Sequence, residues 1–195
     1  MENSNEVEVK IPLSGHVGIQ ARLEETGFRI SVPREWEAND LFDTPDGTLR
    51  QKTMLLRLRQ SGHRSILTWK GPGEPGPHKS RPELETSVGS LDTLRRIFEQ
   101  LGYRQNFRYE KYRTEYKHPD GGGVVTIDET PIGDFLEIEG PAPWIDTTAA
   151  LLGFSPQNYV LESYGSLYLN YCKQRGLEPG NMVFASNPAG TAAQA

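Results

Sequence analysis

Apolar and charged residues alternate one by one near the start of the chain, in the segment EVEVK. Glu6, Glu8 and Lys10 occupy one set of alternate positions, and Val7 and Val9 occupy the other. This period of two predicts a β-strand, because successive side chains of a strand point to opposite faces. The predicted strand therefore has one charged face and one apolar face.

The same alternation predicts strands in much of the remaining chain. The further extended segments are 28–44, two strands within 55–70 that turn at Ser61-Gly62, 80–88, and a three-strand meander formed by 108–118, 123–129 and 134–140. Turn residues such as Gly, Pro and Asp separate these segments. Short connections of this kind predict an antiparallel sheet.

Helices are predicted where apolar residues recur at helical spacing. One begins at Ser14, which can cap it, and ends at Gly27, and a second covers 90–102. A short helix at 144–152 and a C-terminal helix that includes Leu161 follow. These elements form one domain, because no linker divides them.

We place the domain at residues 1–176. The remaining residues, 177–195, are rich in Gly, Pro and Ala. Such a composition supplies too little apolar surface to offset the entropy of folding. We therefore predict that the tail is disordered.

The charged strand faces recur too often for an ordinary solvent-exposed sheet. Exposed faces usually mix Thr, Ser, Gln and Lys, whereas these positions are mostly Arg and Glu. The helices also need apolar surface to cover, which the outer face of a closed sheet supplies. We therefore predict an α+β fold, an antiparallel β-barrel that has a charged interior and helices packed outside.

The two signs of charge in this interior indicate what it encloses. The basic residues are Lys10, Arg57, Arg59, Lys70, Arg81, Lys111 and Arg113. Cations of this kind bind the oxygens of a polyanion such as a phosphate chain. The acidic residues are Glu6, Glu8, Glu85, Asp128, Glu137 and Glu139. They are hard oxygen ligands suited to Mg²⁺ or Mn²⁺, and together the two sets predict a phosphoryl-transfer site.

The motif Glu6-x-Glu8-x-Lys10 resembles the signature of the CYTH family, the triphosphate tunnel metalloenzymes. The resemblance continues through LFDTPDGTLRQKTMLLRLR, TWKGP, RPELET, EKYRTEY, TIDETPIGDFLEIEG and ESYGSLYL, and so spans roughly residues 5 to 172. It implies an eight-stranded antiparallel tunnel that binds a triphosphate. The chain departs from the family pattern at Leu41, where relatives commonly have Tyr, and at Glu162, where many have Lys.

The resemblance implies that Lys10, Glu6 and Glu8 are catalytic residues. Lys10 is either a general base or an electrostatic clamp, and the sequence leaves both roles open. Some relatives pair this lysine with a tyrosine, which residues 28–41 do not contain. This difference favours the clamp.

Three functions are compatible with these residues. The leading prediction is a divalent-metal-dependent triphosphatase that hydrolyses inorganic triphosphate or an organic triphosphate such as thiamine triphosphate. The second is a class IV adenylyl cyclase that converts ATP to cyclic AMP and pyrophosphate. The third is a non-catalytic polyphosphate-binding module, which would not need the full set of carboxylates.

Composition excludes several other classes of partner. The chain has 195 residues, 24% of them charged, a net charge of −5 and one cysteine, and its mean hydropathy is −0.59. It has no apolar run long enough to span a membrane and no signal peptide. We therefore expect a cytoplasmic protein, monomeric or homodimeric, with no membrane or nucleic-acid partner and a triphosphate-containing small molecule as its ligand.

Overall fold

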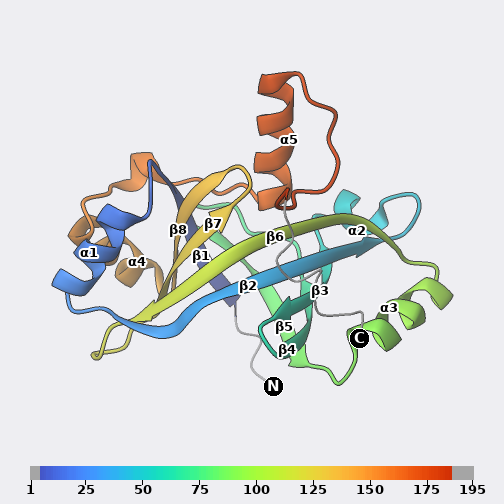
Figure 1. The fold of residues 1–195 in the computed structure, drawn as a ribbon, viewed down its shortest axis with the longest axis horizontal. Helices are drawn as coiled ribbons and strands as arrows, with labels where there is room; N and C mark the ends of the chain where they lie inside the picture. Colours follow the sequence, from blue (N-terminus) through green and yellow to red (C-terminus); the bar gives the residue numbers. More distant parts are fainter. Residues whose placement is uncertain (1–4, 186–195) are drawn as a thin grey trace.

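A closed barrel of eight antiparallel strands dominates the computed structural model, which describes residues 5–185 (Figure 1). The strands are β1 (Asn5–Leu13), β2 (Arg29–Asp43), β3 (Leu55–Ser61), β4 (Arg64–Lys70), β5 (Lys79–Ser87), β6 (Arg104–Lys117), β7 (Val124–Thr130) and β8 (Gly133–Glu139). Around the barrel they follow the order β1-β5-β4-β3-β2-β6-β7-β8. The predicted α+β barrel is confirmed.

The register between β1 and its two neighbours positions the charged faces. Glu8 lies opposite Glu139 of β8, and Lys10 lies opposite Glu137. On the other side, Glu6 lies opposite Arg81 of β5. Because directly paired residues point to the same face of a sheet, the N-terminal motif shares the barrel interior with the charges of β5 and β8.

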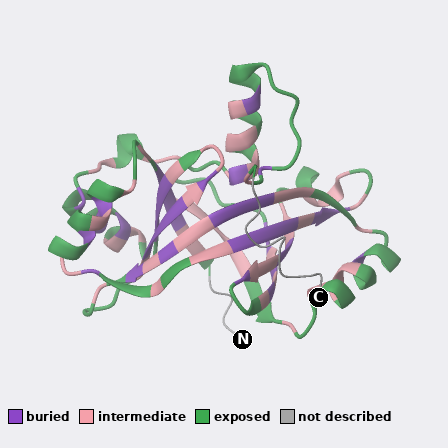
Figure 2. Cartoon of the chain, in the orientation of Figure 1, coloured by how far each residue is buried: buried purple, intermediate pink, exposed green. Residues whose placement is uncertain are grey.

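The apolar strand faces point outward and are covered by helices, as predicted. The helices are α1 (Val17–Glu25), α2 (Thr48–Gln51), α3 (Leu91–Gln100), α4 (Ala142–Leu151), the 3₁₀ helix η1 (Pro156–Asn158) and α5 (Tyr164–Arg175). Leu23 of α1 and Ile145 of α4 pack in one cluster with Val9 and Ile138 of the barrel. Phe98 of α3 packs in a second cluster. Figure 2 shows buried residues along the strands and on the helix faces that meet them.

A third apolar cluster belongs to the inner face of the barrel near α5. Its buried members are Tyr109 of β6, Phe135 of β8, Tyr164 of α5 and Met182. Tyr109 shares the face of Lys111, and Phe135 shares the face of Glu137, so both point inward by strand alternation. The base of α5, which projects from the barrel (Figure 1), thus packs against interior side chains.

The predicted disorder after residue 176 is wrong for 177–185. Met182 is fully buried, and its backbone N–H donates to Arg108 at 2.9 Å while its carbonyl accepts from Glu110 at 2.9 Å. β7 pairs with β6 only from Tyr112 onwards. The backbone of the preceding residues of β6 is therefore free to bond this segment. The rest of the predicted tail, 186–195, lies outside the described residues.

Two helix boundaries also differ from the predictions. α4 begins at Ala142, with Pro141 and Pro143 flanking that residue, rather than at residue 144. α5 begins at Tyr164, where the hydroxyl of Ser163 accepts a hydrogen bond from the backbone of Ser166, so Leu161 precedes the helix. Among the described residues, no helix is both long and apolar enough to cross a membrane.

Candidate active site

The barrel encloses a charged tunnel that has two connected parts. The wide part has a volume of about 320 Å³, and the narrow part, near the base of α5, has a volume of about 80 Å³. Six charged residues line both parts, and these are Glu6, Arg57, Arg59, Lys70, Arg113 and Glu139. The charged strand faces identified in the sequence therefore look into an enclosed space.

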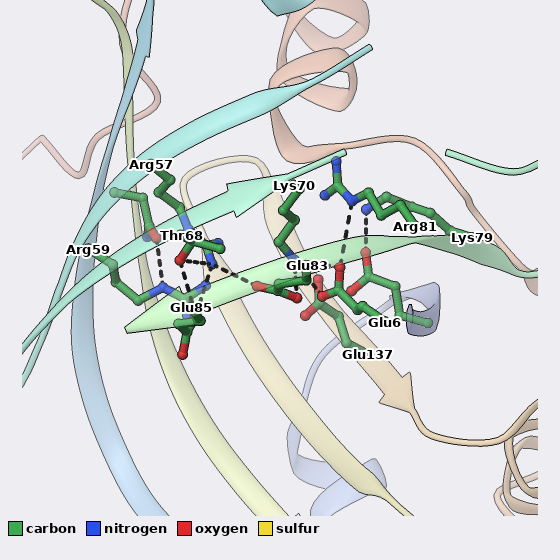
Figure 3. A network of polar contacts seen from close by, with 12 residues as sticks. Glu6, Arg57, Arg59, Thr68, Lys70, Lys79, Arg81, Glu83, Glu85 and Glu137 are labelled. Carbon is green, nitrogen blue, oxygen red and sulfur yellow. Dashed lines mark hydrogen bonds and ion pairs between the residues drawn. The ribbon is translucent and has the colours of Figure 1, made fainter. Parts of the chain in front are cut away.

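All seven basic residues predicted to bind phosphate line the narrow part of the tunnel. They are Lys10, Arg57, Arg59, Lys70, Arg81, Lys111 and Arg113. They come from five different strands, so only closure of the barrel brings them together. Figure 3 shows Arg57, Lys70 and Arg81 projecting from their strands toward the carboxylates.

Two of these guanidinium groups have N–H donors without a partner. Arg57 donates to Thr68 Oγ1 at 3.1 Å and to Tyr109 Oη at 3.3 Å. The Nε groups of Arg57 and Arg81 are buried, however, and neither has a hydrogen-bond partner among the described residues, although Arg81 Nε lies 3.6 Å from a carboxylate oxygen of Glu6. Buried N–H groups are normally paired. Anionic oxygens in the tunnel would supply the missing acceptors.

The carboxylates of the N-terminal motif are paired with lysines. Glu6 accepts hydrogen bonds from Lys70, and Glu8 accepts them from Lys10 and Lys79. Burial opposes ionisation of Glu8, but Lys10 and Lys79 outweigh it and lower its pKa. Burial and Glu8 likewise oppose ionisation of Glu6, and Lys70 and Lys79 hold its pKa below the ordinary value.

Lys10 lies between two carboxylates. Its Nζ is 3.1 Å from Glu8 and 2.9 Å from Glu137. Burial alone would lower the pKa of Lys10, yet Glu137 and Glu8 outweigh it and raise the pKa. The ammonium group therefore stays protonated at neutral pH, as the clamp role requires.

Glu139 differs from its neighbours because it has no cation as a hydrogen-bond partner among the residues described. Glu139 keeps an exposed surface, yet partial desolvation at the tunnel wall, followed by repulsion from Glu6 and Glu8, raises its pKa to about 7. A divalent cation next to Glu139 would relieve this repulsion. The chemistry of the donor set thus fits Mg²⁺ or Mn²⁺, both of which prefer oxygen ligands.

The same carboxylates are not arranged as a complete ligand group. Within residues 5–185, no three acidic, His or Cys side chains are grouped in a way that could hold a metal ion. Glu6 and Glu8 instead contact Lys70 and Lys79. A metal at this position would therefore exchange with lysine partners rather than fill a preformed site.

Asp128, a predicted metal ligand, is engaged by cations. Asp128 is fully buried and is not among the residues that line the tunnel. Its carboxylate accepts hydrogen bonds from Lys111 at 2.8 Å, from Arg113 at 2.7 and 2.6 Å, and from Tyr164 at 2.7 Å. Asp128 therefore orients Lys111 and Arg113, and three of its four hydrogen bonds occupy Oδ2.

Glu137 and Glu85 are weaker candidates among the predicted metal ligands. Glu137 lines the narrow part of the tunnel but pairs with Lys10 and Arg113. Glu85 lines the wide part, its side chain is 43% exposed, and it accepts a hydrogen bond from Thr68. Glu139 is therefore the strongest candidate for a metal ligand, and Glu6 and Glu8 are grouped with it because their charges act on it most strongly.

Several tunnel residues were missing from the predicted site. They are Glu37, Lys79, Glu83, Tyr109 and Tyr164. Lys79, Glu83 and Tyr109 share a strand face with the predicted residues Arg81, Glu85 and Lys111, so continuing the alternation along β5 and β6 would have found them, whereas Glu37 lies on β2, where no site residue was predicted. Lys79, for example, precedes Arg81 by two positions, and burial, followed by Lys10, lowers its pKa to about 8. Tyr164 is placed only by the packing of α5.

The sequence profile of the CYTH domain matches residues 4–150. The chain belongs to the CYTH family. A CYTH relative from Methanocaldococcus jannaschii is 28% identical over 134 residues, which cover 69% of this chain and 75% of the relative. Its name is putative adenylate cyclase.

Solved structures of two further proteins share the fold of this CYTH chain. The Vibrio parahaemolyticus protein, which carries the same name, superposes with a TM-score of 0.76 at 20% identity, covering 85% of this chain and 98% of its own. HpAC1 of Hippeastrum superposes with a TM-score of 0.58 at 15% identity, covering 90% and 97%. HpAC1 is described as having a dominant triphosphatase activity.

Proposed function

We propose that this CYTH protein is a divalent-metal-dependent triphosphatase that hydrolyses inorganic triphosphate or an organic triphosphate such as thiamine triphosphate. One observation carries the proposal: the buried Nε group of Arg57, which has no hydrogen-bond partner among the described residues, shares a tunnel with the six other basic residues predicted to bind phosphate and with the carboxylates around Glu139. Cations that bind phosphate beside oxygen ligands for a metal are the parts of a phosphoryl-transfer site. The activity described for HpAC1 supports the same reaction.

Each set of residues has a separate role in this proposal. The six guanidinium and ammonium groups other than Lys10 bind phosphate oxygens and hold the chain of phosphates along the tunnel. Glu6, Glu8 and Glu139 would hold Mg²⁺ or Mn²⁺, which neutralises charge on the phosphate oxygens and polarises the bond that breaks. Asp128 keeps Lys111 and Arg113 oriented towards the substrate.

Arg57→Ala should weaken the binding of triphosphate by about ten- to a hundredfold. A lost charge-assisted hydrogen bond costs roughly 1.5–3 kcal/mol, and about 1.4 kcal/mol corresponds to a factor of ten. KM and Kd for triphosphate measure the effect. Arg104→Ala is the matched control, because within the described residues the Arg104 side chain forms hydrogen bonds only with the backbone carbonyls of Glu99 and Tyr103. Unchanged kinetics for Arg57→Ala would contradict the phosphate role of this strand.

Lys10→Arg should retain substantial activity with the same pH profile. Lys10 is held protonated by Glu8 and Glu137, and arginine preserves the charge but cannot accept a proton at the pH of the reaction. The pH dependence of kcat and KM measures the outcome, with thermal unfolding as a check on the buried position. Near-total loss of turnover with intact triphosphate binding would instead identify Lys10 as the base.

Adenylyl cyclase activity is the second candidate, because the Methanocaldococcus jannaschii relative bears that name. Both reactions use a bound triphosphate, and they differ in whether water or the ribose hydroxyl attacks. The full chain is incubated with inorganic triphosphate, thiamine triphosphate and ATP in the presence of Mg²⁺ or Mn²⁺, and the products are resolved. Release of inorganic phosphate supports the triphosphatase, cyclic AMP supports the cyclase, and binding without turnover would leave a polyphosphate-binding module.

A further inference from the structure

Tyr109 is a tunnel residue that the proposed function does not yet use. It precedes Lys111 by two positions in β6 and therefore points into the barrel. It is 7% exposed and lines the narrow part of the tunnel. Its hydroxyl lies among the guanidinium and ammonium groups that we assign to phosphate binding.

The ring of Tyr109 is held in place on several sides. Its centroid lies 6.0 Å from that of Phe107 and 5.8 Å from that of Tyr164. Met182 belongs to the same cluster, and its backbone bonds to the two residues that flank Tyr109 in β6. The phenol oxygen is therefore presented at a defined point where the apolar cluster meets the cationic tunnel.

The hydrogen-bonding pattern of this hydroxyl is incomplete. The oxygen accepts a hydrogen bond from Arg57 Nη1 at 3.3 Å. A hydroxyl can also donate one, yet no acceptor for the Tyr109 proton lies within hydrogen-bond distance in the described part of the chain. Tyr164 is different, since it donates to Asp128 at 2.7 Å. The proton of Tyr109 is thus available to a ligand.

The charges around Tyr109 favour an anionic ligand. Burial opposes ionisation of the phenol, but Arg57, Lys111 and Arg59 outweigh it and lower the pKa of Tyr109. A more acidic O–H is a stronger hydrogen-bond donor to a charged oxygen. The hydroxyl and the unpartnered Nε of Arg57 therefore offer donors of the kind that a phosphate group accepts.

We propose that the Tyr109 hydroxyl donates a hydrogen bond to a phosphate oxygen of the bound triphosphate. This inference rests on the proposed function, because it requires a triphosphate in the tunnel. Tyr109 is then a substrate-binding residue that adds a neutral hydrogen-bond donor to the cations of the narrow part of the tunnel. Phenylalanine at this position would keep the packing and lose only the donor.

The test compares the Kd for inorganic triphosphate of the wild type with those of Tyr109→Phe and Tyr112→Phe. Kd is measured by calorimetry on the full chain in excess chelator, so that no metal-dependent turnover occurs. Tyr109→Phe should bind about tenfold more weakly than the wild type, the loss expected for one hydrogen bond to a charged group. Tyr112→Phe is the matched control and should bind as the wild type does. Tyr112 lies on the outer face of the same strand, beside Arg34 and Phe184.

A third variant separates direct contact from an effect through Arg57. Thr68→Val removes the other hydrogen-bond partner of Arg57 but leaves the tyrosine in place. We expect it to weaken binding less than Tyr109→Phe does. Equal losses in both variants, or wild-type affinity in Tyr109→Phe, would overturn the direct contact. Absence of binding by the wild-type chain in chelator would overturn the contact as well, whereas absence of triphosphate hydrolysis in the presence of Mg²⁺ or Mn²⁺ would refute the proposed function itself.

Discussion

Glu139→Gln is expected to lower the rate of triphosphate hydrolysis by about a hundredfold or more at saturating Mg²⁺. Metal ligation supplies several kcal/mol of transition-state stabilisation, and about 1.4 kcal/mol corresponds to a factor of ten in rate. Glutamine preserves the size of the side chain and removes the negative charge. The measurements are kcat with triphosphate and the affinity for Mn²⁺.

The pH dependence of metal binding tests the same residue independently. The pKa of Glu139 is raised to about 7, so below that pH the carboxyl holds a proton that a metal must displace. Metal affinity should therefore increase as the pH rises through 7, and this step should be absent in Glu139→Gln. Without metal, the raised pKa makes the folded state bind the proton more tightly than the unfolded state. Its stabilising contribution is then lost as the pH rises through 7.

Glu129→Gln is the control for both measurements. Glu129 pairs with Arg34 outside the tunnel, so its loss removes an equal charge elsewhere in the protein. We expect unchanged turnover and an unchanged pH profile for metal binding. If Glu139→Gln behaved like this control, the assignment of Glu139 as a metal ligand would be wrong.

Asp128→Ala should destabilise the fold by about 3–5 kcal/mol, the cost of removing one partner from a buried ion pair. The substitution leaves Lys111 and Arg113 without the carboxylate that accepts their hydrogen bonds, and Tyr164 loses its acceptor as well. Urea unfolding of the full chain without metal measures the difference in free energy.

Tyr164→Phe provides the comparison within the same network. It removes a single hydrogen bond to Asp128 and keeps both ion pairs, so the loss should be smaller, at about 1.5–3 kcal/mol for a bond to a charged group. If Asp128→Ala instead had wild-type stability but greatly weakened Mn²⁺ binding, Asp128 would be a metal ligand.

Strand alternation explains how much of the fold could be predicted. In β1, the parity of Glu6, Glu8 and Lys10 against Val7 and Val9 decides which side chains share a face, because a strand turns each successive side chain over. Repetition of charged faces along the chain then implied an enclosed interior. The same alternation placed the predicted phosphate-binding cations on inward faces, and all of them line the tunnel.

The alternation of side chains along a strand determines which face a residue occupies. It does not determine how far along the barrel axis the side chain lies or which charged group it contacts. Asp128 and Glu139 both point inward from their strands, yet Asp128 is buried against two cations and Glu139 is left beside other carboxylates. Register between strands makes this distinction, and it depends on long-range pairing such as that of Glu8 with Glu139.

The contacts that residues 177–185 make with the barrel also could not be predicted from the local sequence pattern. Residues 177–185 belong to a tail that is rich in Gly, Pro and Ala, so its composition favoured disorder. Met182 is ordered because the barrel leaves the backbone of β6 unpaired beside an apolar cluster, and that site exists only in the folded protein. The sequence by itself determined the strands, the inward faces and the charges of the tunnel. Tertiary structure decided which carboxylates are neutralised, because distances between charges on different strands are set by closure of the barrel.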